Sequence, residues 1–293
     1  MNIEKNQDKW AQWMLHKRYG GDNEVQKKAL EFLGEVRDKI LQNAKVVEGN
    51  TVLDVGTGDG LIAFGALDRV GKQDKVIFSD VSRDLLDHCR SLAEELRVID
   101  RCRFLVAPAD NLAGCDDASV DVVTTRSVLI FVEAKQAAFK EFYRVLKPGG
   151  RLSIFEPINR FGHNPSSALF WGYNVEPIAE IAGRIRAVYH RFQPATDPMV
   201  DFDERDLFNM AEKAGFGEVH LELHADMTPA ITVKWESLLR IAPNPLVATL
   251  EEAMRQALTD EEIKMATNYL KPQVEAGQGI RKLAVAYLWA QKN

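Results

Sequence analysis

Three glycines alternate with other residues directly after a short apolar run, at Gly56, Gly58 and Gly60. Glycine lets a backbone turn tightly and lie close against a ligand. The apolar run at 52–55 is typical of a buried strand, and residues 61–70 are apolar enough for a helix packed on a sheet. Strand, glycine loop and helix in this order predict the nucleotide-binding opening of a doubly wound α/β domain.

Two carboxylates near this loop restrict the kind of nucleotide. Asp59 stands where the helix begins, and there it would repel a pyrophosphate but tolerate an ammonium group. A second strand over 75–79 ends at Asp80, an acid placed to accept hydrogen bonds from both hydroxyls of a ribose. The ligand that these residues predict has a ribose, no pyrophosphate and an amino acid end, as S-adenosylmethionine has.

At this point the chain resembles the class I S-adenosylmethionine-dependent methyltransferases, and in particular the small-molecule methyltransferases of the ubiquinone/menaquinone type. The resemblance covers residues 46–157 well, and 203–227 and 280–290 more loosely. It implies an enzyme that uses S-adenosylmethionine and transfers its methyl group to a small molecule. The segments that carry it, in the usual order and spacing, are VLDVGTGDG (52–60), IFSD (77–80), APADNL (107–112), DVVTTRSVLIFV (121–132) and EFYRVLKPGGRLSIFEP (141–157).

The resemblance also assigns residues to the cofactor. Gly56, Thr57 and Gly58 would face the methionine part, Asp80 the ribose and Ala109 with Asp110 the edge of the adenine. One departure is that many relatives have Gly-Asp-Ala where this chain has Ala-Pro-Ala at 107–109, so that Asp110 or Asn111 must replace an acid. The full set of expected cofactor-binding residues is Asp54, Gly56, Thr57, Gly58, Asp80, Val81, Ala109, Asp110, Asn111 and Arg126.

The fold expected is α/β, a doubly wound Rossmann-like arrangement with a seven-stranded mixed sheet. Its methyltransferase core would comprise 46–157 plus 203–227 plus 280–293. Ser82 can cap a helix that runs to about Val98, and Lys147-Pro148-Gly149-Gly150 stops another that begins near Ala134. Further strands are expected at 103–106, 120–125, 152–156, 218–225 and 282–289.

Three segments outside this core are expected to form a cover. They are the helical N-terminus at 1–45 and two insertions, 158–202 and 228–279. The insertions leave the sheet from the carboxyl ends of strands, where ligands bind in open α/β sheets, so we expect the three segments to meet over the methyl donor. The alternative is that they pack on the flank or form a dimer contact. In the second insertion 246–258 is expected to be helical, Thr259 with Glu262 has the pattern of a capping box, and Pro272 is expected to end or kink the helix that follows.

Methyl transfer is an in-line displacement that requires alignment of nucleophile and methyl group, exclusion of water and in some cases a base. His163 follows the fifth strand and is the candidate base, with an exposed loop histidine as the alternative reading. His16, His190, His220 and His224 are further candidates. For the substrate we expect contacts from Trp13, Tyr19, Asn159, Phe161 and Trp171, in keeping with a partly apolar small molecule, while Glu156 and Asn159 could orient an amine.

Composition adds limits. The formal charge is −6, from 37 basic and 43 acidic residues, which argues against a nucleic-acid substrate. No apolar span near ~20 residues and no signal peptide are apparent, so we expect no membrane partner and a cytoplasmic location. The three cysteines form no C-x-x-C pair, and no metal site is expected. A homodimer is possible.

Two other functions remain open. The first is an NAD-dependent oxidoreductase, because Tyr143 and Lys147 have the Tyr-x-x-x-Lys spacing; against it stand Asp59 and the G-x-G-x-G spacing, which is not the dinucleotide pattern. The second is a non-catalytic module that binds S-adenosylmethionine. The acceptor atom can be oxygen, nitrogen, sulfur or carbon on this scaffold, with oxygen or nitrogen preferred.

Overall fold

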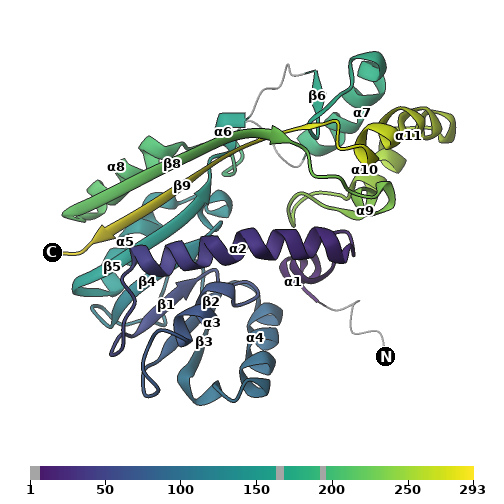
Figure 1. The fold of residues 1–293 in the computed structure, drawn as a ribbon. Helices are drawn as coiled ribbons and strands as arrows, with labels where there is room; N and C mark the ends of the chain where they lie inside the picture. The colour runs from purple at the N-terminus through teal and green to yellow at the C-terminus, as the bar shows by residue number, and fades with distance from the viewer. Residues whose placement is uncertain (1–6, 163–167, 192–195) are drawn as a thin grey trace. The chain divides into compact units, whose positions relative to one another are not determined.

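Seven strands form one mixed sheet in the computed structural model, in the order β3-β2-β1-β4-β5-β9-β8 (Figure 1). From β3 to β5 neighbouring strands are parallel, and β9 is antiparallel to β5. This is the predicted fold class. The strands are β1 (Val52–Val55), β2 (Val76–Asp80), β3 (Cys102–Val106), β4 (Val120–Arg126), β5 (Leu146–Pro157), β8 (Glu218–Pro229) and β9 (Ile280–Gln291).

The structure describes residues 7–162, 168–191 and 196–293, and the chain divides into two compact units. We call Glu31–Phe161, Pro198–His224 and Ala284–Asn293 the core unit. We call Met1–Leu30, Gly162–Asp197 and Ala225–Leu283 the helical unit.

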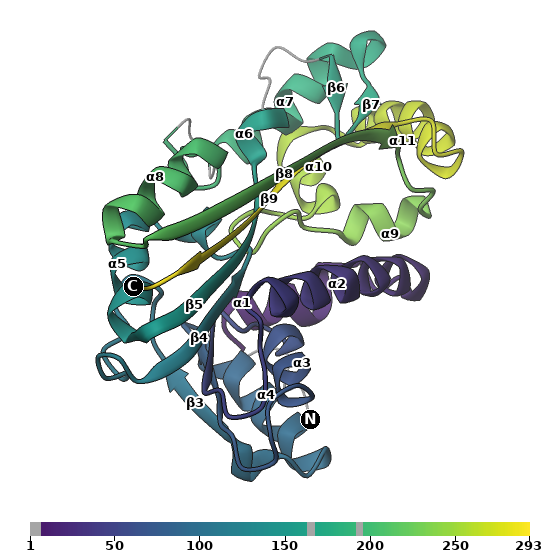
Figure 2. The ribbon, with the colours of Figure 1, turned by 60° about the vertical axis from the view of Figure 1, so that its left-hand side comes forward.

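Helices cover both faces of the sheet in the core unit. Figure 2 shows α5 (Lys135–Val145) and α8 (Glu204–Ala214) on one face, and α3 (Leu61–Leu67) and α4 (Arg83–Glu95) on the other. The hydroxyl of Ser82 accepts a hydrogen bond from the Leu85 amide at 3.1 Å and begins α4 as predicted. The remaining helical elements with residues in this unit are α2 (Asn23–Asn43) and α6 (Asn159–Gly162), which both have residues in the two units, and the 3₁₀ turns Ile99–Arg101 and Leu129–Phe131.

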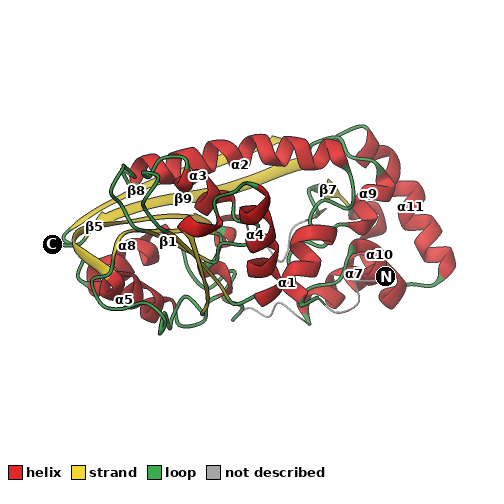
Figure 3. Cartoon of the chain, turned by 90° about the horizontal axis from the view of Figure 1, so that it is seen from below, coloured by secondary structure: helices red, strands yellow, loops and turns green. Residues whose placement is uncertain are grey.

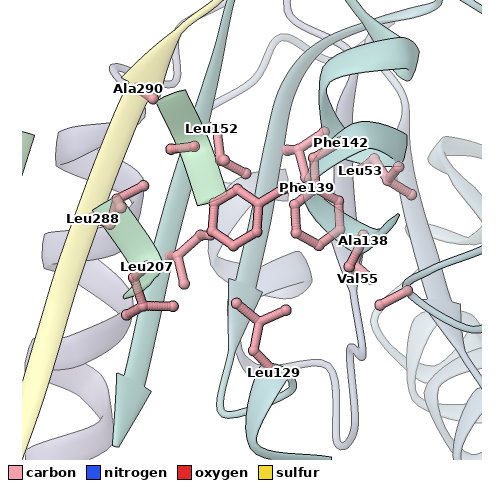
Figure 4. Packing of buried hydrophobic residues seen from close by; sticks show 14 of the residues in the cluster. Leu53, Val55, Leu129, Ala138, Phe139, Phe142, Leu152, Leu207, Leu288 and Ala290 are labelled. Atoms are coloured by element: carbon pink, nitrogen blue, oxygen red, sulfur yellow. The ribbon is translucent and has the colours of Figure 1, made fainter. Parts of the chain in front are cut away.

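The main hydrophobic core lies between α5, α8 and the sheet. Phe139 and Phe142 of α5 are fully buried with ring centroids 5.9 Å apart, and they pack toward Leu53, Leu152 and side chains of β9 (Figure 4). All four residues of β1 are buried, as expected for a central strand covered on both faces. This core lies directly against strands β1, β4, β5 and β9.

The helical unit has a core of its own. Ile185 of α7, Trp235 of α9, Met254 of α10 and Leu270 of α11 belong to one buried cluster, and Figure 3 shows these helices in red. None of the helices within the described residues combines the length and apolar character needed to cross a bilayer. The elements of this unit are α1 (Lys9–Gln12), a π-helical turn (Trp13–Lys17), β6 (Leu169–Phe170), β7 (Tyr173–Asn174), a 3₁₀ turn (Glu176–Ile178), α7 (Ala179–His190), α9 (Trp235–Arg240), α10 (Leu250–Ala257) and α11 (Asp260–Glu275).

Several boundaries differ from the prediction. Strands β8 and β9, which are neighbours in the sheet, are both 12 residues long and extend beyond the predicted 218–225 and 282–289. The helix expected over 246–258 begins at Leu250, since the Thr249 side chain caps it there. Helix α11 has the predicted capping box of Thr259 and Glu262 but runs past Pro272 to Glu275. The Pro272 carbonyl still accepts from the Ala276 amide, so the missing N–H costs one bond without ending the helix.

Candidate functional site

The glycine loop follows β1 in a backbone conformation that other residues rarely adopt. Gly56, Gly58 and Gly60 have φ of +65°, +57° and +82°. A Cβ atom on Gly56 would lie 2.2 Å from Cγ2 of Val128, so the loop also has no room for a side chain there. Both observations explain why glycine is required.

Asp54 lies inside the sheet below this loop and holds it. Its side chain is fully buried, and its two oxygens accept hydrogen bonds from Oγ1 of Thr57 and Oγ1 of Thr124, each at 2.8 Å. Burial raises the pKa of Asp54 to about 6, although these two hydrogen bonds and the charge of Arg126 act in the opposite direction. The side chains of Asp54 and Thr57 therefore fix the loop from within.

Asp80 connects the loop to the start of α4. One carboxylate oxygen accepts from the Gly58 amide and the other from the Ser82 amide, both at 2.9 Å. A carboxylate oxygen has more than one lone pair, so each can accept more than one hydrogen bond. Val81, directly after it, has an exposed apolar side chain. The pair presents an acceptor and an apolar surface at the same strand end.

The turn after β3 is anchored by Glu141 and Arg144 of α5, for which no role was expected from the sequence. Ala109 is buried, Asp110 is half-buried and Asn111 is exposed. The Leu112 amide donates to Oε2 of Glu141 at 2.6 Å. Arg144 donates to Glu141 and to the carbonyls of Leu112 and Cys115, and its bond to Glu141 lowers the pKa of that carboxyl. Glu141 and Arg144 lie one helical turn apart in α5, which is the signal that could have indicated an ion pair.

The end of β4 carries a charge and a strained residue. Arg126 is half-buried, and its charge favours the ionised forms of both Asp54 and Glu156. Ser127 follows with φ of +56°, and its amide donates to the Phe155 carbonyl at 2.8 Å. A non-glycine residue in this region costs free energy and is common at functional sites.

Glu156 differs most from its expected role. The sequence allows it to orient an amine, but its side chain has no exposed surface. Its carboxylate accepts hydrogen bonds from the backbone amides of Val128 at 2.8 Å, Leu129 at 3.0 Å and Ile130 at 3.4 Å. Burial raises the pKa of Glu156 to about 7. The carboxylate therefore binds the backbone of the turn after β4 and does not face a ligand.

Asp59 lies at the start of α3, as predicted. It is half-buried, and its carboxylate accepts a hydrogen bond from the Leu61 amide at 3.4 Å. The carboxylate therefore lies at the helix N-terminus, where a phosphate would otherwise bind. Cys89 of α4 lies buried below the loop, where its thiol donates to the Gly58 carbonyl at 3.3 Å and burial raises its pKa. Around the loop the core unit therefore has carboxylates but no phosphate-binding arrangement among its described residues.

The expected substrate-binding residues divide between the two units. Asn159 and the exposed Phe161 lie in α6. In the helical unit, Nε1 of Trp13 donates to the Ala242 carbonyl at 2.8 Å, Tyr19 lies beneath the Arg18 guanidinium, and Trp171 packs on Phe170. His163, the candidate base, lies outside the described residues.

The other candidate bases pack against neighbouring side chains or lie exposed at the surface. His220 stacks on Trp289 and His224 packs against Tyr287 in a T-shaped arrangement, both within the core unit. His16 lies 3.1 Å from the side-chain oxygen of Gln7, and His190 is exposed at the end of α7. Within the described residues no group of three or more His, Cys, Asp or Glu side chains could hold a metal ion.

Comparison with known proteins gives a consistent result. The model of the ubiE/COQ5 methyltransferase family matches residues 16–235. The ubiquinone/menaquinone biosynthesis C-methyltransferase UbiE of Haemophilus ducreyi is 30% identical over 178 residues, which are 60% of this chain and 67% of that protein. The UbiE protein of Cereibacter sphaeroides is 32% identical over 178 residues, 58% of this chain and 68% of its own.

Solved structures show the same fold at lower identity. The YcgJ protein of Bacillus subtilis has a TM-score of 0.54 and 16% identity, and the match covers 88% of this chain and 97% of that chain. At such identity the likeness shows the fold alone.

Proposed function

The chain belongs to the ubiE/COQ5 methyltransferase family and is an S-adenosylmethionine-dependent methyltransferase, and we propose that it methylates a small molecule by in-line displacement at the site described above. The cofactor would lie along the carboxyl ends of β1, β2 and β4 in the core unit, where open α/β sheets bind their ligands.

The observation that carries the cofactor site is the position of Asp80. Its side chain is buried at the end of β2, and its carboxylate is held by the amides of Gly58 and Ser82. An acceptor fixed in this way suits two vicinal ribose hydroxyls, because both are donors that can reach one carboxylate. Asp59 at the start of α3 opposes a pyrophosphate, which disfavours NAD.

The remaining cofactor contacts follow from this placement. The loop from Gly56 to Gly58 offers backbone groups to the methionine part, with Asp54 and Thr57 fixing it from below. Val81 and the turn Ala109–Asn111 would enclose the adenine. Arg126 would lie near the carboxylate of the cofactor's methionine part, where its positive charge is favourable.

For the acceptor we propose that the helical unit serves as a cover that excludes water, with Trp13, Tyr19 and Trp171 among its residues and Asn159 and Phe161 beside it in sequence. Aromatic side chains suit a partly apolar acceptor. The curated relatives are named C-methyltransferases, so a carbon nucleophile stands beside the oxygen and nitrogen nucleophiles that we expected from the sequence. A small molecule is also favoured over nucleic acid by the net charge of −6.

Calorimetry tests the cofactor site. Wild type should bind S-adenosylhomocysteine and should not bind NAD. Asp80→Ala should weaken the binding of S-adenosylhomocysteine at least about tenfold, since hydrogen bonds to a charged acceptor contribute about 1.5–3 kcal/mol. The matched control is Asp87→Ala, which removes an exposed carboxylate from α4 and should bind like wild type. Binding of NAD, or equal binding by Asp80→Ala and wild type, would contradict the proposal.

A further inference from the structure

Glu156 is a buried carboxylate that the proposed chemistry does not use. It lies near the carboxyl end of β5 and accepts three consecutive backbone amides, those of Val128, Leu129 and Ile130. The first amides of a helical turn have no partner within the turn, and here Leu129–Phe131 is such a turn. Glu156 therefore supplies the acceptors that keep this backbone in place.

Val128 extends the influence of Glu156 to the glycine loop. Its Cγ2 atom occupies the space next to Gly56 that a Cβ atom would need, at 2.2 Å from that position. The preceding Ser127 is held with φ of +56°, and its amide is bonded to the carbonyl of Phe155, the neighbour of Glu156. The strained turn and the glycine loop are thus packed together and tied to β5.

We propose that Glu156 is a positioning residue for cofactor binding: its ionised carboxylate fixes the turn at 128–130 so that Val128 supports the glycine loop at Gly56. This inference rests on the proposed function, because it takes the glycine loop as the wall of the methionine site. Glu156 acts through Val128 and has no exposed surface of its own for a ligand.

The charge state of Glu156 then controls the affinity. The charge of Arg126 on β4 favours the ionised form of Glu156, its pairing partner in β9 is Ala286, and the turn at 128–130 donates backbone amides. Burial outweighs these influences and raises the pKa of Glu156 to about 7. Hydrogen bonds to an ionised acceptor are about twice as strong as those to a neutral one, so the turn loosens as Glu156 takes up its proton on acidification.

The test is the dissociation constant of S-adenosylhomocysteine at pH values of about 6, 7 and 8, on either side of that pKa, measured by calorimetry. At the highest pH Glu156→Gln should raise Kd about tenfold relative to wild type, the equivalent of one charge-assisted bond replaced by a neutral one. As the pH falls, the Kd of wild type should rise toward that of the variant, so that the two nearly coincide at the lowest pH. Asp54 titrates in both proteins and leaves their ratio unchanged. The control is Glu133→Gln, an exposed glutamate a few residues after the turn, which should follow wild type at every pH.

Three results would overturn the proposal: equal Kd for Glu156→Gln and wild type at the highest pH, a ratio that does not change with pH, or a matching loss in Glu133→Gln. If wild type itself binds no S-adenosylhomocysteine at any pH, the proposed function fails instead. If circular dichroism shows that Glu156→Gln does not fold, Val128→Ala decides the matter. It keeps Glu156 but removes the support of Gly56, and it should raise Kd about threefold at the highest pH, whereas an unchanged Kd refutes the inference.

Discussion

Val128 and Gly56 share one space: the Cγ2 atom of the valine lies 2.2 Å from the position of a Cβ atom on the glycine. The two residues follow β4 and β1, which are adjacent and parallel, with Val55 paired to Thr125. The loops that leave these two strand ends are therefore packed directly on each other. The glycine loop owes its shape to a neighbouring loop as well as to its own residues.

Gly56→Ala should consequently destabilise the protein. The new methyl group would overlap Val128, and alanine would have to adopt φ of +65°. Strain of about 1–2 kcal/mol and overpacking of about 1–3 kcal/mol should together lower the free energy of unfolding by about 2–5 kcal/mol. Urea denaturation measures the difference.

A second glycine provides the control for that experiment. Gly183 lies in α7 without a positive φ, and a Cβ atom added to it would meet no atom within 4 Å beyond its chain neighbours and the nearby backbone of its own helix. Gly183→Ala should be neutral or stabilise by up to about 1 kcal/mol. If Gly56→Ala were as harmless as Gly183→Ala, the packing of the two loops would be refuted; if Val128→Ala relieves part of the loss in the double variant, it is supported.

Asp54 should make stability fall as the pH rises through the acidic range. Burial raises its pKa in the folded protein from 3.8 to about 6, so the folded state binds the proton more tightly than the unfolded state does. The resulting stabilisation is complete below about pH 4 and is lost as the pH rises to about 6, a change of about 3 kcal/mol. Asp54→Asn should lack it. The measurement is the free energy of unfolding of both proteins across and above this pH range, and a difference that stays constant with pH would contradict the expectation.

Lys135 and Asp201 form an ion pair with unequal partners. The Lys135 side chain is 6% exposed and that of Asp201 is 38% exposed, with Nζ 2.6 Å from Oδ1. Lys135 also donates to the Val132 carbonyl at 2.9 Å. Asp201→Ala leaves a buried ammonium with fewer acceptors, whereas after Lys135→Met water can solvate the aspartate. We expect Asp201→Ala to lower the free energy of unfolding by about 2–3 kcal/mol and Lys135→Met to lower it by about 1 kcal/mol, as measured by urea denaturation. The reverse order would contradict this account.

Trp171 offers a test of the cover that separates acceptor from cofactor. With Gly172 it forms the two-residue turn between β6 and β7, and both residues have positive φ, +51° and +87°. Such turns favour asparagine at the first position, so Trp171→Asn should fold well. It should raise the KM for the acceptor about tenfold through loss of aromatic contact and leave the Kd of S-adenosylhomocysteine unchanged. An unchanged KM would remove Trp171 from the proposed acceptor site.

The parts of the site that lie close together in the sequence were predictable. The alternation of Gly56, Gly58 and Gly60 and the acid at the end of β2 are local patterns, and the structure places them at neighbouring strand ends. The caps at Ser82 and Thr259 are likewise set by residues three positions apart. Local chemistry therefore indicated the sequence of strands, loops and helices and the nature of the ligand.

Contacts between distant segments were not predictable in the same way. Glu156 receives the amides of 128–130 because β4 and β5 pair in a particular register, which no local pattern encodes. The anchoring of the turn after β3 by Glu141 depends on where α5 packs. Pro272 was expected to end or kink α11, and it does not end it: the residues on either side, Leu270 and Val274, are buried by tertiary packing, and the helix continues to Glu275.

The most direct measurement is a crystal structure of the protein with S-adenosylhomocysteine bound. The ribose hydroxyls should lie about 2.7–3.0 Å from the carboxylate of Asp80, with the amino acid end along Gly56–Gly58. A ligand bound elsewhere, or a crevice that accepts a diphosphate but no adenosyl amino acid, would contradict the account.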